Sequence, residues 1–230
     1  MQLASRNVCE AVEIPKVARS SAKALSLDEV ARLLTAAENT RWGPFTALAF
    51  ALGARRGELC ALKWVDVDLD AKTVTVRASL SQTKASVTFK PTKTDRVRTV
   101  ALSRFAIEAF RRQRATQAQE RLRAGGAYED RGLVFSDELG RVMTPMTATC
   151  AYERLARKAN ISSTRLHDAR HTAATQLLVA GVDVRSVSGI LGHGSATTTL
   201  ATYAPLLADA QRDGIDRLGE RLERRPSLKP

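Results

Sequence analysis

Residues 72–102, KTVTVRASLSQTKASVTFKPTKTDRVRTVAL, form the stretch in which β-branched residues alternate with polar ones. Such alternation is typical of half-buried strands, whereas helices repeat their apolar positions every three or four residues. The stretch therefore predicts a small antiparallel sheet of two or three strands. Lys93 is expected in the tight connection between two of these strands.

The sequence on both sides of this stretch has helical periodicity. In SLDEVARLLTAAEN (26–39), Ser26 and Glu29 have the spacing of a capping box. Two further helices are predicted on either side of Gly53, and a long one is stopped by Gly125 and Gly126. The predicted helices are 26–39, 41–54, 55–64, 103–125 and about 147–159, 167–180 and 183–190, with a short extended piece at 132–136. The expected fold class is mainly α with a small antiparallel β-sheet.

The charge of the chain points to a polyanionic partner. Its 230 residues hold 36 Lys and Arg against 24 Asp and Glu, a net charge of +12, and the isoelectric point is about 10.3. An excess of this size is typical of proteins that bind nucleic acid, although some proteins are merely basic. A length of 230 residues is enough to bury a sizeable core.

The cysteines and apolar runs narrow the cellular setting. Cys9, Cys60 and Cys150 are widely spaced and odd in number, which indicates neither a disulfide framework nor a zinc site. The longest apolar run, FTALAFALGA, is too short to cross a bilayer, which needs about 20 residues. We therefore expect a soluble, intracellular protein without a membrane partner.

Basic residues at a helix start and near the strands are candidates for an anion site. Arg55 and Glu58 share one face of a helix, and arginine offers a planar fork to two phosphate oxygens. An exposed ion pair is the ordinary alternative. Lys93 is a further candidate, and Lys90, Arg96 and Arg98 are candidates for contacts with a nucleic-acid backbone.

Two more motifs follow, LHDARHTAATQLL (166–178) and LGHGSATTTLATYAP (191–205). His167 and Arg170 lie three residues apart at a helix start, so both can reach one small anion. Asp168 is expected to cap this helix, and His171 to be a packing or hydrogen-bonding residue. His193 lies between two glycines, and Tyr203 follows ten residues later. Taken singly, each of these residues is more often structural than catalytic.

Taken together, the order Arg, Lys, His-x-x-Arg, Gly-His and Tyr resembles the catalytic domain of the tyrosine recombinases, the phage integrase family. The resemblance covers roughly residues 25–205. It implies that Arg55 and Arg170 clamp the scissile phosphate, that Lys93 protonates the leaving 5′-oxygen and that Tyr203 is the nucleophile. His167 and His193 take the two remaining catalytic positions, and Glu58 is the supporting acidic residue.

This set suits a phosphoryl transfer without metal, cofactor or ATP. Two permanently charged guanidinium groups can neutralise the charge that develops on the phosphate. A free tyrosine has a pKa near 10 and must lose its proton during attack, for which His167 is the candidate base. The resulting 3′-phosphotyrosyl link conserves bond energy, and a 5′-hydroxyl on another strand can reverse the step.

The resemblance also implies a domain layout and partners. Residues 1–24 are similar to an interdomain linker remnant, and residues 206–230 to a C-terminal helix and tail exchanged between subunits. The implied partners are double-stranded DNA carrying a recombination core site, a homotetramer on that DNA and accessory DNA-bending proteins. The implied activity is integration or excision of a phage or other mobile element. Two alternatives stay open: a type IB topoisomerase-like strand transferase and a DNA-binding module that has lost cleavage.

Overall fold

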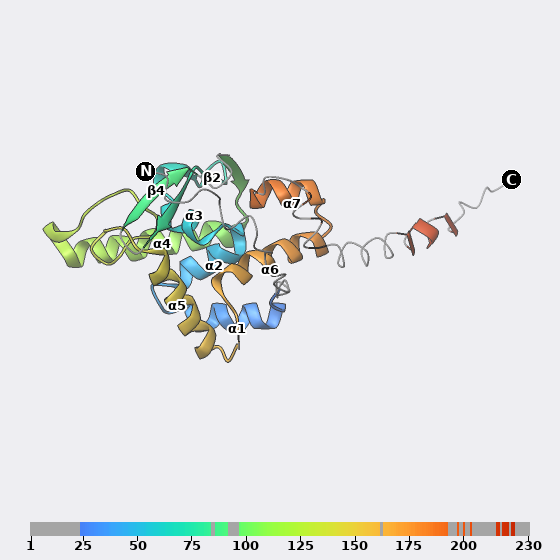
Figure 1. Ribbon diagram of the computed structural model, residues 1–230, viewed down its shortest axis with the longest axis horizontal. Coiled ribbons are helices and arrows are strands. Elements are labelled where there is room, and N and C mark those ends of the chain that lie inside the picture. Colours follow the sequence, from blue (N-terminus) through green and yellow to red (C-terminus); the bar gives the residue numbers. More distant parts are fainter. Residues whose placement is uncertain are drawn as a thin grey trace, which may run out of the picture.

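The computed structural model describes residues 24–83, 86–91, 97–161 and 163–192, together with 197, 200, 203, 215, 216, 218–220, 222 and 223. Helices dominate this part of the chain, and the strands gather on one side of it (Figure 1). The α-helices are α1 (Leu27–Ala37), α2 (Gly43–Leu52), α3 (Arg56–Ala61), α4 (Arg104–Ala124), α5 (Pro145–Lys158), α6 (Leu166–Val179) and α7 (Val184–Leu191). The strands are β1 (Val67–Asp68), β2 (Thr73–Val76), β3 (Ala78–Gln82), β4 (Val87–Pro91) and β5 (Arg98–Ala101), and two short 3₁₀ turns cover Trp64–Asp66 and Gly125–Ala127.

The helix boundaries follow the sequence signals closely. The Ser26 side chain accepts from the backbone N–H of Glu29, and the Glu29 carboxylate accepts from that of Ser26, which confirms the capping box. Gly53 ends α2 in the left-handed conformation, with φ of +55°, and α3 begins three residues later. The Asp168 carboxylate accepts from the backbone N–H of Arg165, as its predicted capping role requires.

The strands form two small antiparallel sheets where the sequence predicts one. β2 pairs with β1 and β5, while β3 pairs with β4 in a separate hairpin. Val76 pairs with Arg98, and Ala78 pairs with Pro91. Between these two pairs the chain advances two positions on one side and seven on the other. The ladder cannot keep its register across that mismatch, and the sheet divides there.

The segment that contains Lys93 follows the described hairpin. The turn of the described hairpin is at Thr83, whose backbone N–H donates to the carbonyl of Ser86 at 2.8 Å. Lys93, which is expected in the connection between two strands, comes later in the chain. It belongs to the interval between β4 and β5, where residues 92–96 lie outside the described residues.

The main core lies around α2, which packs against α4 and α6, while α1 packs against α5 (Figure 1). Phe45 of α2 is fully buried, and its ring meets Phe135 edge to face with 4.9 Å between the centroids. Trp64 packs partly buried on Phe110 and donates its indole N–H to Gln117. These contacts fix α2 and the start of α3, which carry the first candidate site residues.

A second apolar cluster joins α6, α7 and the segment that follows them. It contains Ala174, Leu178, Val187, Leu191 and Tyr203. At the other end of the described chain, the backbone N–H of Leu25 donates to the Thr172 hydroxyl at 2.9 Å. Helix α6 is thus held both by the first described residues and by a late tyrosine.

The fold class is confirmed: the protein is mainly α with small antiparallel sheets. No helix within the described ranges is long and apolar enough to cross a membrane.

Candidate active site

Glu58 is the buried acidic centre of the candidate site. Its side chain has no exposed surface, because Gly57 beside it lets α3 approach β3 very closely. A Cβ atom on Gly57 would lie 2.5 Å from the carbonyl oxygen of Leu80. The carboxylate is thereby placed beneath the start of α3.

Three donors compensate for the burial of this carboxylate. Glu58 Oε2 accepts from the backbone N–H of Arg55 at 2.9 Å and from Arg98 Nη2 at 2.6 Å, and Oε1 accepts from Arg55 Nη1 at 2.8 Å. Burial alone would raise the pKa of Glu58, but the hydrogen bonds and charges of Arg98 and Arg55 outweigh it and hold that pKa below its ordinary value. Glu58 is therefore a charged anchor for two arginines.

Arg98 connects the sheet to helix α7. Its Nε donates to the carbonyl of Ile190 at 2.8 Å, and its side chain is only 9% exposed. A Cβ atom on Gly192 would lie 2.7 Å from Arg98 Nη1, so the glycine makes room for the guanidinium. Arg98 is a predicted candidate for contact with a DNA backbone, but in this structure its guanidinium binds Glu58 and the carbonyl of Ile190.

Arg55 and Arg170 bring two guanidinium groups close together. Arg55 donates to Glu58 and, through Nη2, to the carbonyl of Gly192 at 3.1 Å. Arg170 is 3% exposed and donates through Nη1 to the carbonyls of Gly53 and Leu191, each at 2.8 Å. Its Nη2 is buried and has no hydrogen-bond partner within the described part of the chain. Such a nitrogen is a donor suited to an anionic ligand.

Burial, followed by the repulsion of Arg55, lowers the pKa of Arg170 to about 10. Arg170 is still charged at neutral pH. Within the described residues, Arg55 is paired with the carboxylate of Glu58, whereas the hydrogen bonds of Arg170 go to backbone carbonyls. The positive charge of Arg170 therefore favours the binding of an anion at this position.

Two histidines follow one face of α6. Their rings are perpendicular, with centroids 4.7 Å apart. His167 is exposed and His171 half-buried. For both, burial is the main cause that lowers the pKa, and neighbouring positive charges, Arg170 among them, add to it. Both rings are therefore uncharged at neutral pH.

Tyr203 reaches the site from the second apolar cluster. Its side chain is 5% exposed, and its hydroxyl lies 3.0 Å from Nδ1 of His171. Burial raises the pKa of Tyr203 to about 12, and the charge of Arg170 acts in the opposite direction. His167 is the predicted base, but the described contact of the hydroxyl is with His171.

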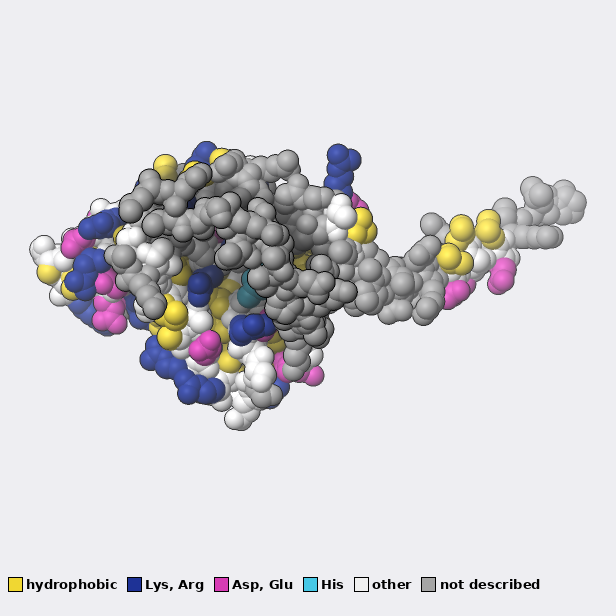
Figure 2. All heavy atoms as spheres, viewed as in Figure 1, with side chains coloured by type: hydrophobic (Ala, Val, Ile, Leu, Met, Phe, Trp, Pro, Cys, Tyr) yellow, Lys and Arg dark blue, Asp and Glu magenta, His cyan; other side chains and the backbone are white. Residues whose placement is uncertain are grey.

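A groove of about 630 Å³ opens beside these residues. Arg55 and His167 line it together with Arg56 and Arg165, and the hydroxyls of Ser79 and Ser81 contribute to its other wall. Basic side chains are also spread over the described surface in Figure 2, where acidic ones lie among them. The groove is the described hollow in which His167 and Arg55 are both accessible.

The structure thus brings Arg55, Glu58, His167, Arg170 and Tyr203 together from α3, α6 and the C-terminal segment. Lys93, His193 and Arg96 lie outside the described residues, and Lys90 is exposed on β4. The hydrogen bond of His171 agrees with its prediction as a packing or hydrogen-bonding residue, but its contact with Tyr203 and the pairing of Arg98 with Glu58 were not predicted. The four-residue spacing of His167 and His171 was the signal for the former, while no local signal pointed to the pairing of Arg98.

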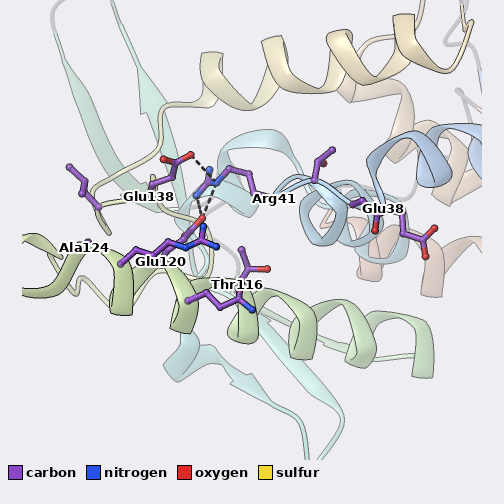
Figure 3. Close-up of a pocket in the computed structure, with 11 residues that line it drawn as sticks. Glu38, Arg41, Thr116, Glu120, Ala124 and Glu138 are labelled. Atoms are coloured by element: carbon purple, nitrogen blue, oxygen red, sulfur yellow. Dashed lines mark hydrogen bonds and ion pairs between the residues drawn. The ribbon is translucent and has the colours of Figure 1, made fainter.

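A different pocket, of about 620 Å³, lies between α4 and the turn after α1 and shares no lining residue with the groove (Figure 3). Arg41 binds Glu120 at 3.0 Å there and approaches Glu138 at 4.0 Å. The second oxygen of Glu120 is buried without a partner within the described ranges. These ion pairs indicate a structural role for this pocket.

Comparison with known proteins gives one consistent result. Residues 23–209 match the phage integrase family. The chain is similar to the tyrosine recombinase XerC-like protein of Caldanaerobacter subterraneus, with 28% identity over 84% of this chain and 53% of that protein. It is also similar to tyrosine recombinase XerD of Mycobacterium tuberculosis, with 30% identity over 86% of this chain and 61% of that protein. The chain thus spans between about half and two thirds of these relatives.

Solved structures share the fold. The crystal structure of XerA recombinase superposes with a TM-score of 0.65 and 29% identity, over 78% of this chain and 59% of that one. The Tn1549 transposon integrase in complex with transposon right end DNA gives a TM-score of 0.74 and 22% identity, over 94% of this chain and 71% of that one.

Proposed function

The chain belongs to the phage integrase family, and we propose that it is a site-specific DNA recombinase that cuts and rejoins strands through a 3′-phosphotyrosyl intermediate. One observation carries this proposal: the buried Nη2 of Arg170 has no described partner and lies within the electrostatic reach of Arg55 and Tyr203. A phosphodiester placed there meets two cations and a tyrosine hydroxyl.

In the proposed reaction, the Tyr203 oxygen attacks phosphorus and the bond to the 5′-oxygen breaks. Arg55 and Arg170 neutralise the charge that develops on the non-bridging oxygens. Glu58 orients Arg55 through two of its hydrogen bonds. Lys93 and His193 keep the roles that the family resemblance implies, with Lys93 as the acid for the leaving oxygen. The proposed reaction needs no metal, cofactor or ATP.

The proposed substrate is double-stranded DNA with a core recombination site of a phage or other mobile element. The net charge of +12 supports a polyanionic partner, and the groove beside Arg55 carries further basic residues. Lys90 and Arg96 remain candidate contacts with the backbone. The structural relatives include the XerH recombinase bound to its difH substrate, which supports a DNA partner here by similarity.

We extend the proposal to assembly. Ile215, Leu218 and Leu222 are each more than half exposed and lie within three or four residues of the next, so they can form one apolar stripe of a helix. Docking of residues 206–230 on a neighbouring subunit of a homotetramer would cover that stripe. Accessory DNA-bending proteins complete the proposed complex, which acts in the bacterial cytoplasm and on the nucleoid. Residues 1–24 are proposed as a linker and 25–205 as the catalytic domain.

The first test uses a pool of labelled, nicked duplexes with a randomised core, incubated at low salt with the full chain or with its Tyr203→Phe variant. We expect a protease-sensitive covalent band on a denaturing gel for the wild type and none for the variant, while both retard DNA on a native gel. Sequencing the trapped DNA gives the site.

Three results would contradict parts of this proposal. A band with Tyr203→Phe would overturn the assigned nucleophile. DNA retardation without any band from the wild type would favour a binding module that has lost cleavage. Relaxation of a supercoiled plasmid without any joining of two labelled duplexes would favour a topoisomerase-like transferase.

A further inference from the structure

His167 and His171 serve different sides of the site although they lie one turn apart on α6. His167 is exposed and lines the groove together with Arg55. His171 is half-buried and faces Tyr203, with 6.3 Å between the ring centroids. The four-residue spacing places both rings along one helix face, with the ring of His171 deeper in the protein.

The contact between His171 and Tyr203 joins a ring nitrogen to the reacting atom itself. Nδ1 of His171 lies 3.0 Å from the hydroxyl oxygen, which is hydrogen-bond distance. The tyrosine is 5% exposed, so bulk water has little access to it. A proton leaves such a hydroxyl most readily toward a partner already within hydrogen-bond reach.

His171 can act as that partner because its ring is uncharged. Burial lowers the pKa of His171, and the charges of His167, Arg170 and Arg165 lower it further against the opposing effect of Asp168. One ring nitrogen then carries a free lone pair. The positive charge of Arg170 simultaneously favours the ionised form of Tyr203.

We infer that His171 is a catalytic residue that accepts the proton of Tyr203 through Nδ1. This inference rests on the proposed function and assigns a role within it. The O–H bond of Tyr203 breaks and an N–H bond forms on His171, while the oxygen forms the bond to phosphorus. The bond from phosphorus to the 5′-oxygen breaks, and that oxygen takes the proton assigned above to Lys93. Religation returns both protons.

The assignment leaves His167 on the groove side, beside Arg55 and the phosphate. His171 therefore acts on the nucleophile, while His167 lies beside the phosphate. A structural role for His171 makes a different prediction, because an acceptor that only holds the tyrosine need not take up a proton.

The first test needs no DNA and follows the histidine ring nitrogens by ¹⁵N NMR on the full chain. We expect His171 to carry its proton on Nε2, with Nδ1 accepting a hydrogen bond that is lost in Tyr203→Phe. A proton on Nδ1 in the uncharged ring, or an unchanged His171 spectrum in Tyr203→Phe, would overturn the inference.

The second test compares His171→Asn with the wild type on a nicked duplex recovered by the wild-type protein. The Asn oxygen keeps an acceptor near the position of Nδ1 but cannot take the proton. At pH 7 we expect cleavage to slow by about 10²–10⁴-fold, the usual contribution of a general base, and to recover as pH rises. His171→Gln is the second variant should the first fold poorly.

A substrate with sulfur at the 5′-bridging position provides the matched control. Sulfur leaves without a proton, so it should relieve the defect of Lys93→Ala but not that of His171→Asn. Cleavage by His171→Asn at the wild-type rate, a defect equal at every pH, or rescue by sulfur would each contradict the inference. Failure of the wild type to form any adduct would instead contradict the proposed function.

Discussion

Arg98 and Glu58 lie 40 positions apart in the chain and form a buried ion pair with 2.6 Å between Nη2 and Oε2. Arg98 also holds the carbonyl of Ile190, and Glu58 holds Arg55. The pair therefore connects strand β5, helix α3 and the end of helix α7. One buried carboxylate thus links three elements that surround the candidate site.

Removal of Arg98 should destabilise the fold. Arg98→Met leaves Glu58 buried without its closest partner, and breaking a buried pair on one side costs about 3–5 kcal/mol of unfolding free energy. Urea unfolding measures this cost. The double variant Glu58→Gln, Arg98→Met should lose clearly less than the sum of the single losses, because neither the Glu58 carboxylate nor the buried Arg98 guanidinium is left without the other. Additive losses would show that the two side chains act independently.

Gly53 should not tolerate a side chain. Its φ is +55°, and a Cβ atom would lie 2.7 Å from Cδ2 of Leu191. Gly181, with φ of +84° and nothing within 4 Å of a Cβ atom, is the matched control. Gly181→Ala should cost about 1–2 kcal/mol for the left-handed backbone, and Gly53→Ala more, because it adds the steric overlap. Equal losses in urea unfolding would show that Leu191 yields without cost.

Acid should destabilise the protein before its carboxylates titrate. The folded pKa values of His167 and His171 lie below the unfolded value of about 6.5, so between these values the unfolded chain binds more protons. The free energy of unfolding should therefore fall as pH is lowered from 7 to 5. Loss of the Glu58 contribution follows below its ordinary pKa of 4.5.

Urea unfolding at pH 7, 6 and 5 measures this dependence. The double variant His167→Asn, His171→Asn should give a flatter profile than the wild type over that range. An unchanged slope would assign the effect to other groups.

The ion pair in the pocket of Figure 3 should affect stability without affecting catalysis. Arg41→Met leaves the buried Glu120 carboxylate without its cation, which should lower the unfolding free energy by several kcal/mol. Arg41→Met, Glu120→Gln should recover part of that loss. Cleavage of the recovered duplex by folded protein should match the wild type in both. A selective loss of cleavage would connect this pocket to the active site.

Local signals predicted most of the helices because their causes lie within a few residues. The Ser26–Glu29 capping box and the left-handed Gly53 end or begin helices through their own backbone contacts. The three-residue spacing of Arg55 and Glu58 likewise predicted an ion pair that the structure contains. Such features need no knowledge of the rest of the fold.

Contacts between residues far apart in the chain could not be predicted from local sequence patterns. His171 and not His167 meets Tyr203, because the tyrosine packs on α7 and the second half of α6, 32 residues away in the chain. The pairing of Arg98 with Glu58 joins residues 40 positions apart, so no local pattern predicts it. The sheet divides because the chain advances seven positions from Pro91 to Arg98 but only two between their partners, a mismatch that composition does not reveal.

The hydrogen bond from Leu25 to Thr172 has a consequence for protein engineering. Thr172 follows His171 directly, and its hydroxyl also donates to the carbonyl of Asp168. Tension applied to the chain ahead of Leu25 would therefore act on the helix that holds Arg170. A fusion joined close to residue 24 would place a mechanical load on α6, whereas a spacer there would isolate this helix.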